Sequence, residues 1–318
     1  MDQKKEMRSV MADFLAKQMA LDDGIIVLDA DLAKSNGTFF LHEAFPGRAI
    51  GMGIAEANMV STAAGLAAYG FEPYIFSFCP FVSRRVADQI AISVAYSGLN
   101  VKIIGSDPGI TAQLNGATHM GNEDVGIMRS IPNMIIFEPA DIVQYEKALK
   151  QVRAYEGPVY IRQLRKLETR IFFDYKDYQF DLFRADTIKT GSDLTLIAAG
   201  IELEQAWYAA ETLQKLNIDA ELINVHTIKP LDEETIIRSV KKTGRAVVCE
   251  NHNIIGGLCS AVAEAAGRWC PVPLEFIGIR DRFGEVGKLP YLLKKFKMDS
   301  DSIVGAAVKL MERKICQG

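Results

Sequence analysis

Short apolar runs alternate along this chain with longer stretches that have helical periodicity. The first apolar run, residues 25–28, follows a stretch over 7–19 in which apolar residues recur every three or four positions. Uninterrupted apolar runs are typical of strands that are buried on both faces of a parallel sheet. Since such strands alternate here with helix-like stretches of about ten residues or more, the pattern predicts βαβ units.

The alternation is interrupted once, over residues 170–193, where aromatic and charged side chains follow no regular period. A chain of 318 residues has room for roughly two domains of about 150 residues each. We therefore predict two doubly wound α/β domains, the first with a mostly parallel sheet. The expected boundaries are residues 1–175 for the first domain, 176–190 for a linker and 191–318 for the second domain.

The expected elements follow from the same patterns. In the first domain we expect strands at 25–28, 73–78, 101–104, 133–137 and 158–161, and helices at 7–19, 55–69, 83–96 and 140–155. In the second domain we expect strands at 194–199, 220–225, 246–249 and 274–277, and helices at 201–216, 233–242, 256–268 and 300–314.

Charge and hydropathy exclude several classes of protein. The chain has 36 basic and 40 acidic residues, so it lacks the basic excess that nucleic-acid binding requires. No apolar stretch approaches the roughly 18 residues of a membrane span. The first ten residues lack the apolar core of a signal peptide. We expect a cytoplasmic protein that binds neither nucleic acid nor a membrane.

The cysteine pattern indicates neither a disulfide framework nor a metal site. The cysteines are odd in number and scattered, no Cys-x-x-Cys occurs, and the four histidines form no zinc motif. We expect buried free thiols and no metal ligand in this chain. The cysteines are Cys79, Cys249, Cys259, Cys270 and Cys316.

One acidic residue stands out among the segments that follow predicted strands, where parallel sheets bind their ligands. Glu56 begins a predicted helix that is otherwise rich in Ala, Met, Val and Gly, which suggests that its side chain is buried. Burial of a carboxyl is costly without a polar partner and raises its pKa. The alternative is a capping acid at a helix N-terminus. The residues alone leave both interpretations open. The preceding Gly51-Met52-Gly53 lacks the third glycine of a dinucleotide fingerprint.

Two further segments are candidates for binding. The aromatic residues of 76–81 (FSFCPF) belong either to the core or to a platform for a flat ring. Residues 109–121 form a long, glycine-rich, polar connection between two predicted strands. Long structured loops are often functional, and His119 lies within this one.

Several linked blocks of the sequence resemble the C-terminal half of transketolases. In order, the blocks are GMGIAEANMVSTAAGLAAYGFEPYIFSFCPFVSRRVADQI, GATHMGNEDVGIMRSIPNMIIFEPAD and GPVYIRQ, then VHTIKPLD and VVCENHNIIGG in the second domain. The resemblance covers essentially the whole chain. It implies a pyrimidine-binding domain for thiamine diphosphate, followed by a transketolase C-terminal-like domain.

The resemblance also assigns roles to the candidate cofactor residues. Glu56 matches the glutamate that hydrogen-bonds N1′ of the aminopyrimidine ring, where a protonatable carboxyl favours the tautomer that removes the thiazolium C2 proton. Phe78 and Phe81 match the aromatic residues that enclose this ring. His119 matches a histidine that contacts oxygen atoms of the donor substrate, and we expect it to take part in catalysis.

Four other residues are implied to bind substrate. Arg162 matches an arginine that holds the sugar phosphate, for which a forked guanidinium is well suited. Arg8 and Ser35 match two further phosphate-contacting residues. Asn115 stands where the family has an aspartate that hydrogen-bonds the C2 hydroxyl of the donor. An amide is uncharged and can donate as well as accept hydrogen bonds. This departure leaves the sugar specificity open.

A second departure predicts a partner. Thiamine diphosphate enzymes bind the diphosphate through magnesium, using a Gly-Asp-Gly motif and a later asparagine on a separate domain, and this sequence has no Gly-Asp-Gly. We therefore predict a split enzyme, in which an N-terminal-type subunit carries the diphosphate and magnesium site. We expect a heterotetramer with shared active sites, and an inactive dimer when this chain is alone.

The resulting functional prediction is transfer of a two-carbon ketol unit from a ketose phosphate to an aldose phosphate. The alternatives are a 1-deoxyxylulose-5-phosphate synthase-like subunit, the β subunit of a 2-oxoacid dehydrogenase, and a transketolase specialised for branched or modified sugars. A non-catalytic scaffold is also an alternative, but it would need none of the cofactor and substrate residues.

Overall fold

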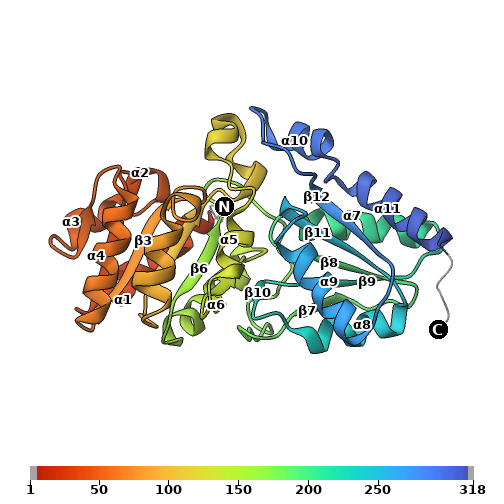
Figure 1. Ribbon diagram of the computed structural model, residues 1–318, viewed down its shortest axis with the longest axis horizontal. Helices are drawn as coiled ribbons and strands as arrows, with labels where there is room; N and C mark the ends of the chain where they lie inside the picture. The colour runs from red at the N-terminus through yellow and green to blue at the C-terminus, as the bar shows by residue number, and fades with distance from the viewer. Residues whose placement is uncertain (1–5, 314–318) are drawn as a thin grey trace.

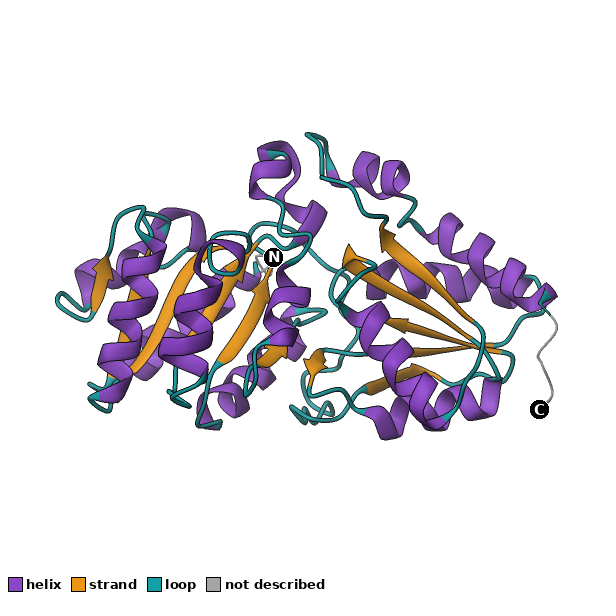
Figure 2. Cartoon of the chain, in the orientation of Figure 1, coloured by secondary structure: helices purple, strands orange, loops and turns teal. Residues whose placement is uncertain are grey.

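Two twisted sheets, each covered by helices on both faces, lie side by side in the molecule (Figures 1 and 2). The computed structural model describes residues 6–313. The fold class predicted from the alternation of strands and helices is confirmed. Among the described residues, no helix is both long and apolar enough to cross a membrane.

The first domain contains a seven-stranded sheet with the strand order β10-β5-β6-β4-β3-β1-β2, in which all neighbours except β10 and β5 are parallel. Its strands are β1 (Ile25–Asp29), β2 (Ala49–Gly51), β3 (Glu72–Phe78), β4 (Lys102–Ser106), β5 (Ile135–Phe137) and β6 (Val159–Gln163). Its helical segments are α1 (Met7–Met19), α2 (Ala33–Asn36), α3 (Phe39–Ala44), α4 (Glu56–Ala68), η1 (Arg84–Val86), η2 (Gln89–Ala95), η3 (Gly109–Asn115), η4 (Ala117–His119), α5 (Asp124–Ser130) and α6 (Ile142–Ala154).

The second domain contains a five-stranded sheet with the order β12-β11-β8-β9-β7. The strands encoded by this part of the chain are β7 (Asp186–Lys189), β8 (Leu194–Ala198), β9 (Ala220–Asn224), β10 (Thr227–Lys229), β11 (Ala246–Asn253) and β12 (Leu274–Ile279). The helices are α7 (Glu202–Lys215), α8 (Glu233–Thr243), α9 (Leu258–Trp269), α10 (Leu289–Phe296) and α11 (Ser300–Glu312).

Alternate residues of β1 face opposite sides of the first sheet, as the pleat of a strand requires. Ile25 and Val27 pack in the core that includes α1 and α6, whereas Ile26 and Leu28 pack in the core that includes α4 and η2. All five residues of β1 are buried, which explains why the strand is an uninterrupted apolar run.

Residues 83–96 differ from the single helix that we expected. They form the 3₁₀ turn η1 and then the π-helical segment η2. In the latter, the backbone N–H of Tyr96 donates to the carbonyl of Ala91, five residues earlier. The apolar periodicity predicts a helical segment here, but it does not distinguish among the three kinds of helix.

Three strands were not expected. β2 has only three residues and pairs parallel with β1 at the edge of the first sheet. β7 lies within residues 176–190 and pairs antiparallel with β9, so the second sheet begins before the expected boundary at residue 191. Residues of β7 are partly exposed, and the strand therefore lacks a buried apolar run. β10 has only three residues and pairs antiparallel with β5, at the edge of the first sheet. A segment of the second domain thus completes the sheet of the first.

The cysteines in the described residues are free, as expected. Cys79, Cys249 and Cys259 are buried, and Cys270 is partly buried. Cys316 and the expected end of the last helix at residue 314 lie outside the described residues. Within residues 6–313, no group of His, Cys, Asp and Glu side chains could hold a metal ion.

Candidate functional site

The carboxyl group of Glu56 is buried at the start of α4, where only 2% of the residue is exposed. Ser77 Oγ donates to its Oε1 at 3.0 Å, and Arg85 Nη1 donates to its Oε2 at 2.7 Å. Both carboxylate oxygens are thus paired with side chains of other elements, β3 and η1. The structure therefore favours a buried, partnered carboxyl over the alternative of a helix-capping acid.

Two aromatic rings lie next to this carboxyl. Phe78 ends β3 directly after Ser77, and Phe81 follows in the next turn; their rings are nearly perpendicular, with centroids 6.0 Å apart. The imidazole ring of His119 contacts both, at 5.2 Å from Phe78 and 5.3 Å from Phe81. The fold thus brings the aromatic segment and the 109–121 connection together, beside Glu56.

Arg85 belongs to the same cluster, although the sequence analysis did not single it out. Its guanidinium group lies 4.0 Å from the centroid of the Phe81 ring while it pairs with Glu56. The sequence pattern predicts a helix over residues 83–96 and assigns no functional residue to it. The sequence signal that could have identified Arg85 is the pair Arg84-Arg85, which follows the aromatic residues of 76–81 by only a few positions.

Arg162 does not face this site, which corrects its expected role. Its side chain has no exposed surface and lies between the two domains. Nε donates to Asp124 Oδ2 at 2.8 Å, Nη1 to Glu138 Oε2 at 2.5 Å, and Nη2 to the Asn251 carbonyl at 2.9 Å. Each guanidinium nitrogen already has a partner inside the protein, and the side chain has no exposed surface, so Arg162 is not accessible to a sugar phosphate.

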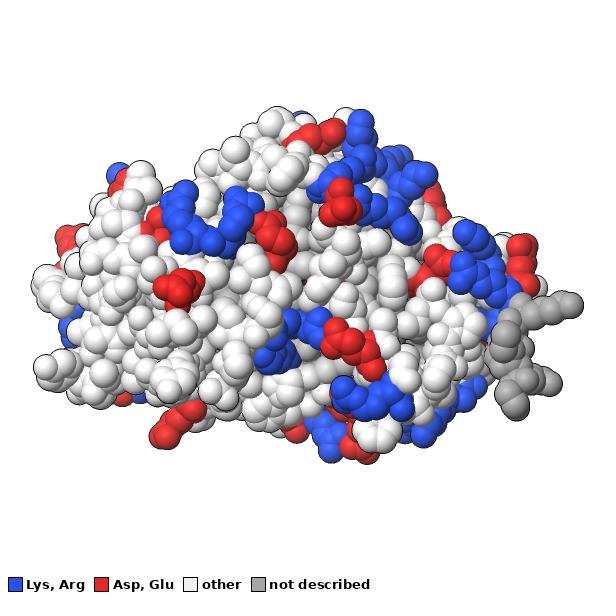
Figure 3. All heavy atoms as spheres, viewed as in Figure 1, with Lys and Arg blue, Asp and Glu red and all other residues white. Residues whose placement is uncertain are grey.

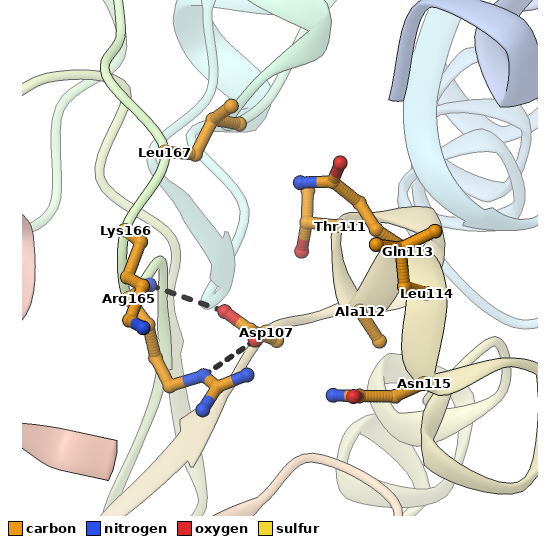
Figure 4. Close-up of a pocket in the computed structure, with 9 residues that line it drawn as sticks. All are labelled: Asp107, Thr111, Ala112, Gln113, Leu114, Asn115, Arg165, Lys166 and Leu167. Atoms are coloured by element: carbon orange, nitrogen blue, oxygen red, sulfur yellow. Dashed lines mark hydrogen bonds and ion pairs between the residues drawn. The ribbon is translucent and has the colours of Figure 1, made fainter. Parts of the chain in front are cut away.

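Arg165, three residues further on, faces a cavity of about 210 Å³ instead (Figure 4). Its Nε donates to Asp107 Oδ2 at 2.5 Å, and its guanidinium group lies 4.6 Å from the centroid of the Phe78 ring. Asn115 lines the opposite wall, with its amide directed into the cavity (Figure 4). The walls are formed by Asp107, Thr111, Ala112, Gln113, Leu114, Asn115, Arg165, Lys166 and Leu167.

The carboxyl group of Asp107 interacts with both Arg165 and Arg8. Burial raises the pKa of this carboxyl, and the positive charges of Arg165 and Arg8 oppose that increase. Arg8 also donates through Nη1 to the main-chain carbonyl of Ser35 at 2.8 Å, and through Nε to Glu6 at 2.6 Å. Arg8 and Ser35 are therefore neighbours.

Basic side chains gather beside the cavity. Figure 3 shows them over α10 and its surroundings, at the upper right of the view, and the segment 280–297 contains six Lys or Arg residues against two acidic ones. Helix α10 packs against η3, which forms one wall of the cavity. A positive surface at this place attracts anionic ligands, although the chain as a whole has a net charge of −4.

Comparison with known families matches both domains. Residues 3–169 match the pyrimidine-binding domain of transketolase, and residues 184–303 match the transketolase C-terminal domain.

Individual relatives extend over nearly the whole chain. The 6-deoxy-6-sulfo-D-fructose transketolase subunit SqwH of Clostridium sp. (strain MSTE9) is 51% identical over 97% of this chain and 95% of its own length. A putative transketolase C-terminal section of Methanocaldococcus jannaschii is 38% identical, over 97% of both chains. The solved structure of a split-gene transketolase, described as an inactive beta4 tetramer, is 36% identical, covers 97% of this chain and 99% of its own, and has a TM-score of 0.87.

Proposed function

Because the chain belongs to the transketolase family, we propose that it is the pyrimidine-binding subunit of a split transketolase. Two relatives support this proposal. One is named as a transketolase subunit and the other is described as a split-gene transketolase, and each matches this chain over almost its full length. The observation that carries the proposal is the carboxyl of Glu56, which is buried beside an aromatic pair and His119.

The residues around Glu56 fit an aminopyrimidine ring. A buried carboxyl can hold a hydrogen bond to a ring nitrogen, and Phe78 and Phe81 offer apolar faces to a flat ring. Thiamine diphosphate, when bound, supplies the carbon centre that carries the two-carbon unit. The role of Glu56 is to hold a proton at N1′, and Ser77 orients its carboxyl by hydrogen bonding to Oε1.

We assign the donor substrate to the space between His119 and the cavity. His119 offers its Nε2 to donor oxygens, since its Nδ1 hydrogen-bonds Thr118 Oγ1 at 2.9 Å, and Asn115 offers an amide that can both donate and accept. Arg165 takes over the role that we had expected of Arg162, namely to bind the anionic end of the sugar, with Arg8 nearby. Ser35 remains a candidate contact through its position next to Arg8.

The diphosphate and magnesium are assigned to an N-terminal-type partner subunit, because this sequence has no Gly-Asp-Gly motif. We propose a heterotetramer of two chains of each kind, with the active sites between them. For this chain alone we expected a dimer, and the solved relative is described as a tetramer of β chains. A cytoplasmic location stays a prediction.

The cavity also supports a more specialised transketolase. The relative that is 51% identical is named for a sulfonated fructose. A cavity with Arg165 and Lys166 on one side and an uncharged Asn115 on the other suits a donor with a terminal phosphate or sulfonate group. No feature of the site favours the synthase-like or dehydrogenase-like alternatives.

The experiment is reconstitution with the candidate partner. We would measure thiamine diphosphate binding by calorimetry for this chain, for the partner and for the pair, and then screen donor and acceptor sugars for ketol transfer. The proposal predicts tight cofactor binding and ketol transfer by the pair only. A pair that assembles but binds no thiamine diphosphate would support the non-catalytic scaffold instead.

A further inference from the structure

The segment from Pro108 to Gly121, called here the substrate loop, carries both Asn115 and His119. Its ends meet where Pro108 bridges Gly121 and the Gly109 N–H donates to the Gly121 carbonyl. The loop contains no strand and consists of the two short turns η3 and η4. It therefore needs contacts from outside to hold its two polar side chains in fixed positions.

The second domain supplies such contacts through Asn251, a fully buried residue in β11. The Asn251 Oδ1 accepts a hydrogen bond from the Ile110 N–H at 2.9 Å, and its Nδ2 donates to the Pro108 carbonyl at 2.8 Å. One side-chain amide thus satisfies a donor and an acceptor of the substrate-loop backbone. Buried amides with both ends paired fix the orientation of their partners.

The packing at this point leaves no room for a side chain on Gly109. A Cβ atom on Gly109 would lie 2.2 Å from Asn251 Oδ1, and Gly109 has a φ of +52°, a conformation that favours glycine. The backbone of the substrate loop therefore lies directly against the amide of Asn251. A side chain at position 109 would force the two apart.

Further contacts to the second domain continue along the loop. The Leu289 N–H donates to Gln113 Oε1 at 3.1 Å, at the start of α10. Gly116 packs closely against the Val286 side chain, and Met120 packs closely against Gly284. The second domain therefore touches the substrate loop at its beginning, middle and end.

We propose that the second domain positions the substrate loop for catalysis, and that Asn251 is the main positioning residue. The inference rests on the proposed function, since it concerns the placement of Asn115 and His119 toward a donor sugar. Asn251 acts through the loop and does not itself touch substrate. Misplacement of reacting groups by about 1 Å can lower a rate about 100-fold.

The first test needs neither cofactor nor partner. The C2 proton of the His119 imidazole lies in the ring-current field of Phe78 and Phe81, so its NMR chemical shift reports the position of the loop. The chain has four histidines, and a His119→Asn variant identifies the relevant signal. In Asn251→Ala we expect this signal to move toward the value of a free histidine.

Asn224→Ala is the matched control. Asn224 is also a fully buried asparagine near the carboxyl end of a strand in the second sheet, but its Nδ2 donates to Asp186 and not to the loop. We expect Asn224→Ala to lose stability while the His119 signal stays in place. An unchanged His119 signal in folded Asn251→Ala would overturn the proposal, whatever the activity of the pair.

The second test uses the reconstituted pair. We expect Asn251→Ala to lower kcat/KM for the donor about 100-fold while thiamine diphosphate affinity changes less than threefold, because Glu56 and the aromatic pair lie on other elements. Equal losses in Asn251→Ala and Asn224→Ala would also overturn the proposal. If the wild-type pair has no activity, the proposed function fails while the NMR test still decides the positioning role.

Discussion

Arg162 and Asp124 form a two-point ion pair in which neither side chain has exposed surface. Nε and Nη2 of Arg162 lie 2.8 and 3.1 Å from the two carboxylate oxygens of Asp124. Nη1 donates to Glu138. Burial raises the pKa of this carboxyl, and the positive charge of Arg162 opposes part of that increase. Because Nη2 also reaches the Asn251 carbonyl, this network joins the two domains.

The first prediction follows from this burial. Arg162→Met leaves Asp124 and Glu138 without their cation, and breaking a buried pair in this way costs about 3–5 kcal/mol. We expect urea denaturation to show a loss of this size in the free energy of unfolding. A variant of native stability with a raised KM for sugar phosphate would instead restore the substrate role expected from the sequence.

The second prediction concerns Arg165. We expect Arg165→Met to raise the KM for an anionic donor about 10- to 100-fold, which corresponds to the loss of one hydrogen bond between charged groups. The kcat should fall much less, because in the proposed binding mode Arg165 binds the distal end of the substrate and not the reacting atoms. Steady-state kinetics of the reconstituted pair would measure both constants.

The control for Arg165 is Arg184→Met, which removes an exposed arginine on the second domain, where Arg184 pairs with Glu234. This substitution should leave the KM unchanged. An equal rise in KM for the two variants would assign the effect to overall charge and not to the cavity.

The third prediction is a pH dependence caused by His226. Burial lowers the pKa of His226 to about 4, and its Nε2 hydrogen-bonds the Arg184 carbonyl at 2.7 Å. The unfolded chain, where a histidine has a pKa of about 6.5, therefore binds this proton first as the pH falls. The neutral His226 side chain therefore contributes its full stabilisation above about pH 6.5, and this stabilisation is lost as the pH falls from about 6.5 to about 4.

The contribution of His226 is measured as the difference between the wild type and His226→Gln. This comparison is needed because the carboxyl of Asp186 lies nearby and burial raises its pKa to about 6. Protonation of Asp186 therefore changes the stability in the opposite direction as the pH falls. The free energy of unfolding of the wild type should decrease by about 3 kcal/mol more than that of the variant between these pH values. Parallel pH profiles for the two proteins would contradict this account of the buried histidine.

The sequence predicted secondary structure best where buried apolar residues form a continuous run or recur at a regular spacing. The buried strands β1 and β8 were expected from apolar runs, and α4 from a stretch that is rich in Ala and Met. β10 could not be found in this way. Its three residues are too short for any period, and its pairing with β5 depends on how the two domains dock.

The candidate site was predictable to the extent that it follows local motifs. Glu56, Phe78, Phe81 and His119 do come together, although their segments are separated along the chain. The environment of Arg162 was not predictable, since its partners Asp124, Glu138 and Asn251 come from three distant segments. A sequence motif identifies a residue type at a position, whereas long-range packing decides whether its side chain meets a ligand or another side chain.

The fourth prediction concerns assembly. The chain alone should be folded and inactive, with a mass that is two or four times 35.1 kDa in light scattering after size-exclusion chromatography. Addition of the partner should shift the mass to that of a mixed complex and produce ketol transfer. A chain that is monomeric and active alone would contradict the shared active site.

The most direct test of the central claim is ketol transfer by the pair that contains Glu56→Gln. This change keeps the size of the side chain and the contact with Ser77, but it removes the protonatable carboxyl. We predict that the variant pair assembles normally and that kcat falls about 100- to 10,000-fold, the range for loss of a proton-transferring group. A variant pair that assembles and turns over at the wild-type rate would contradict the catalytic role of Glu56.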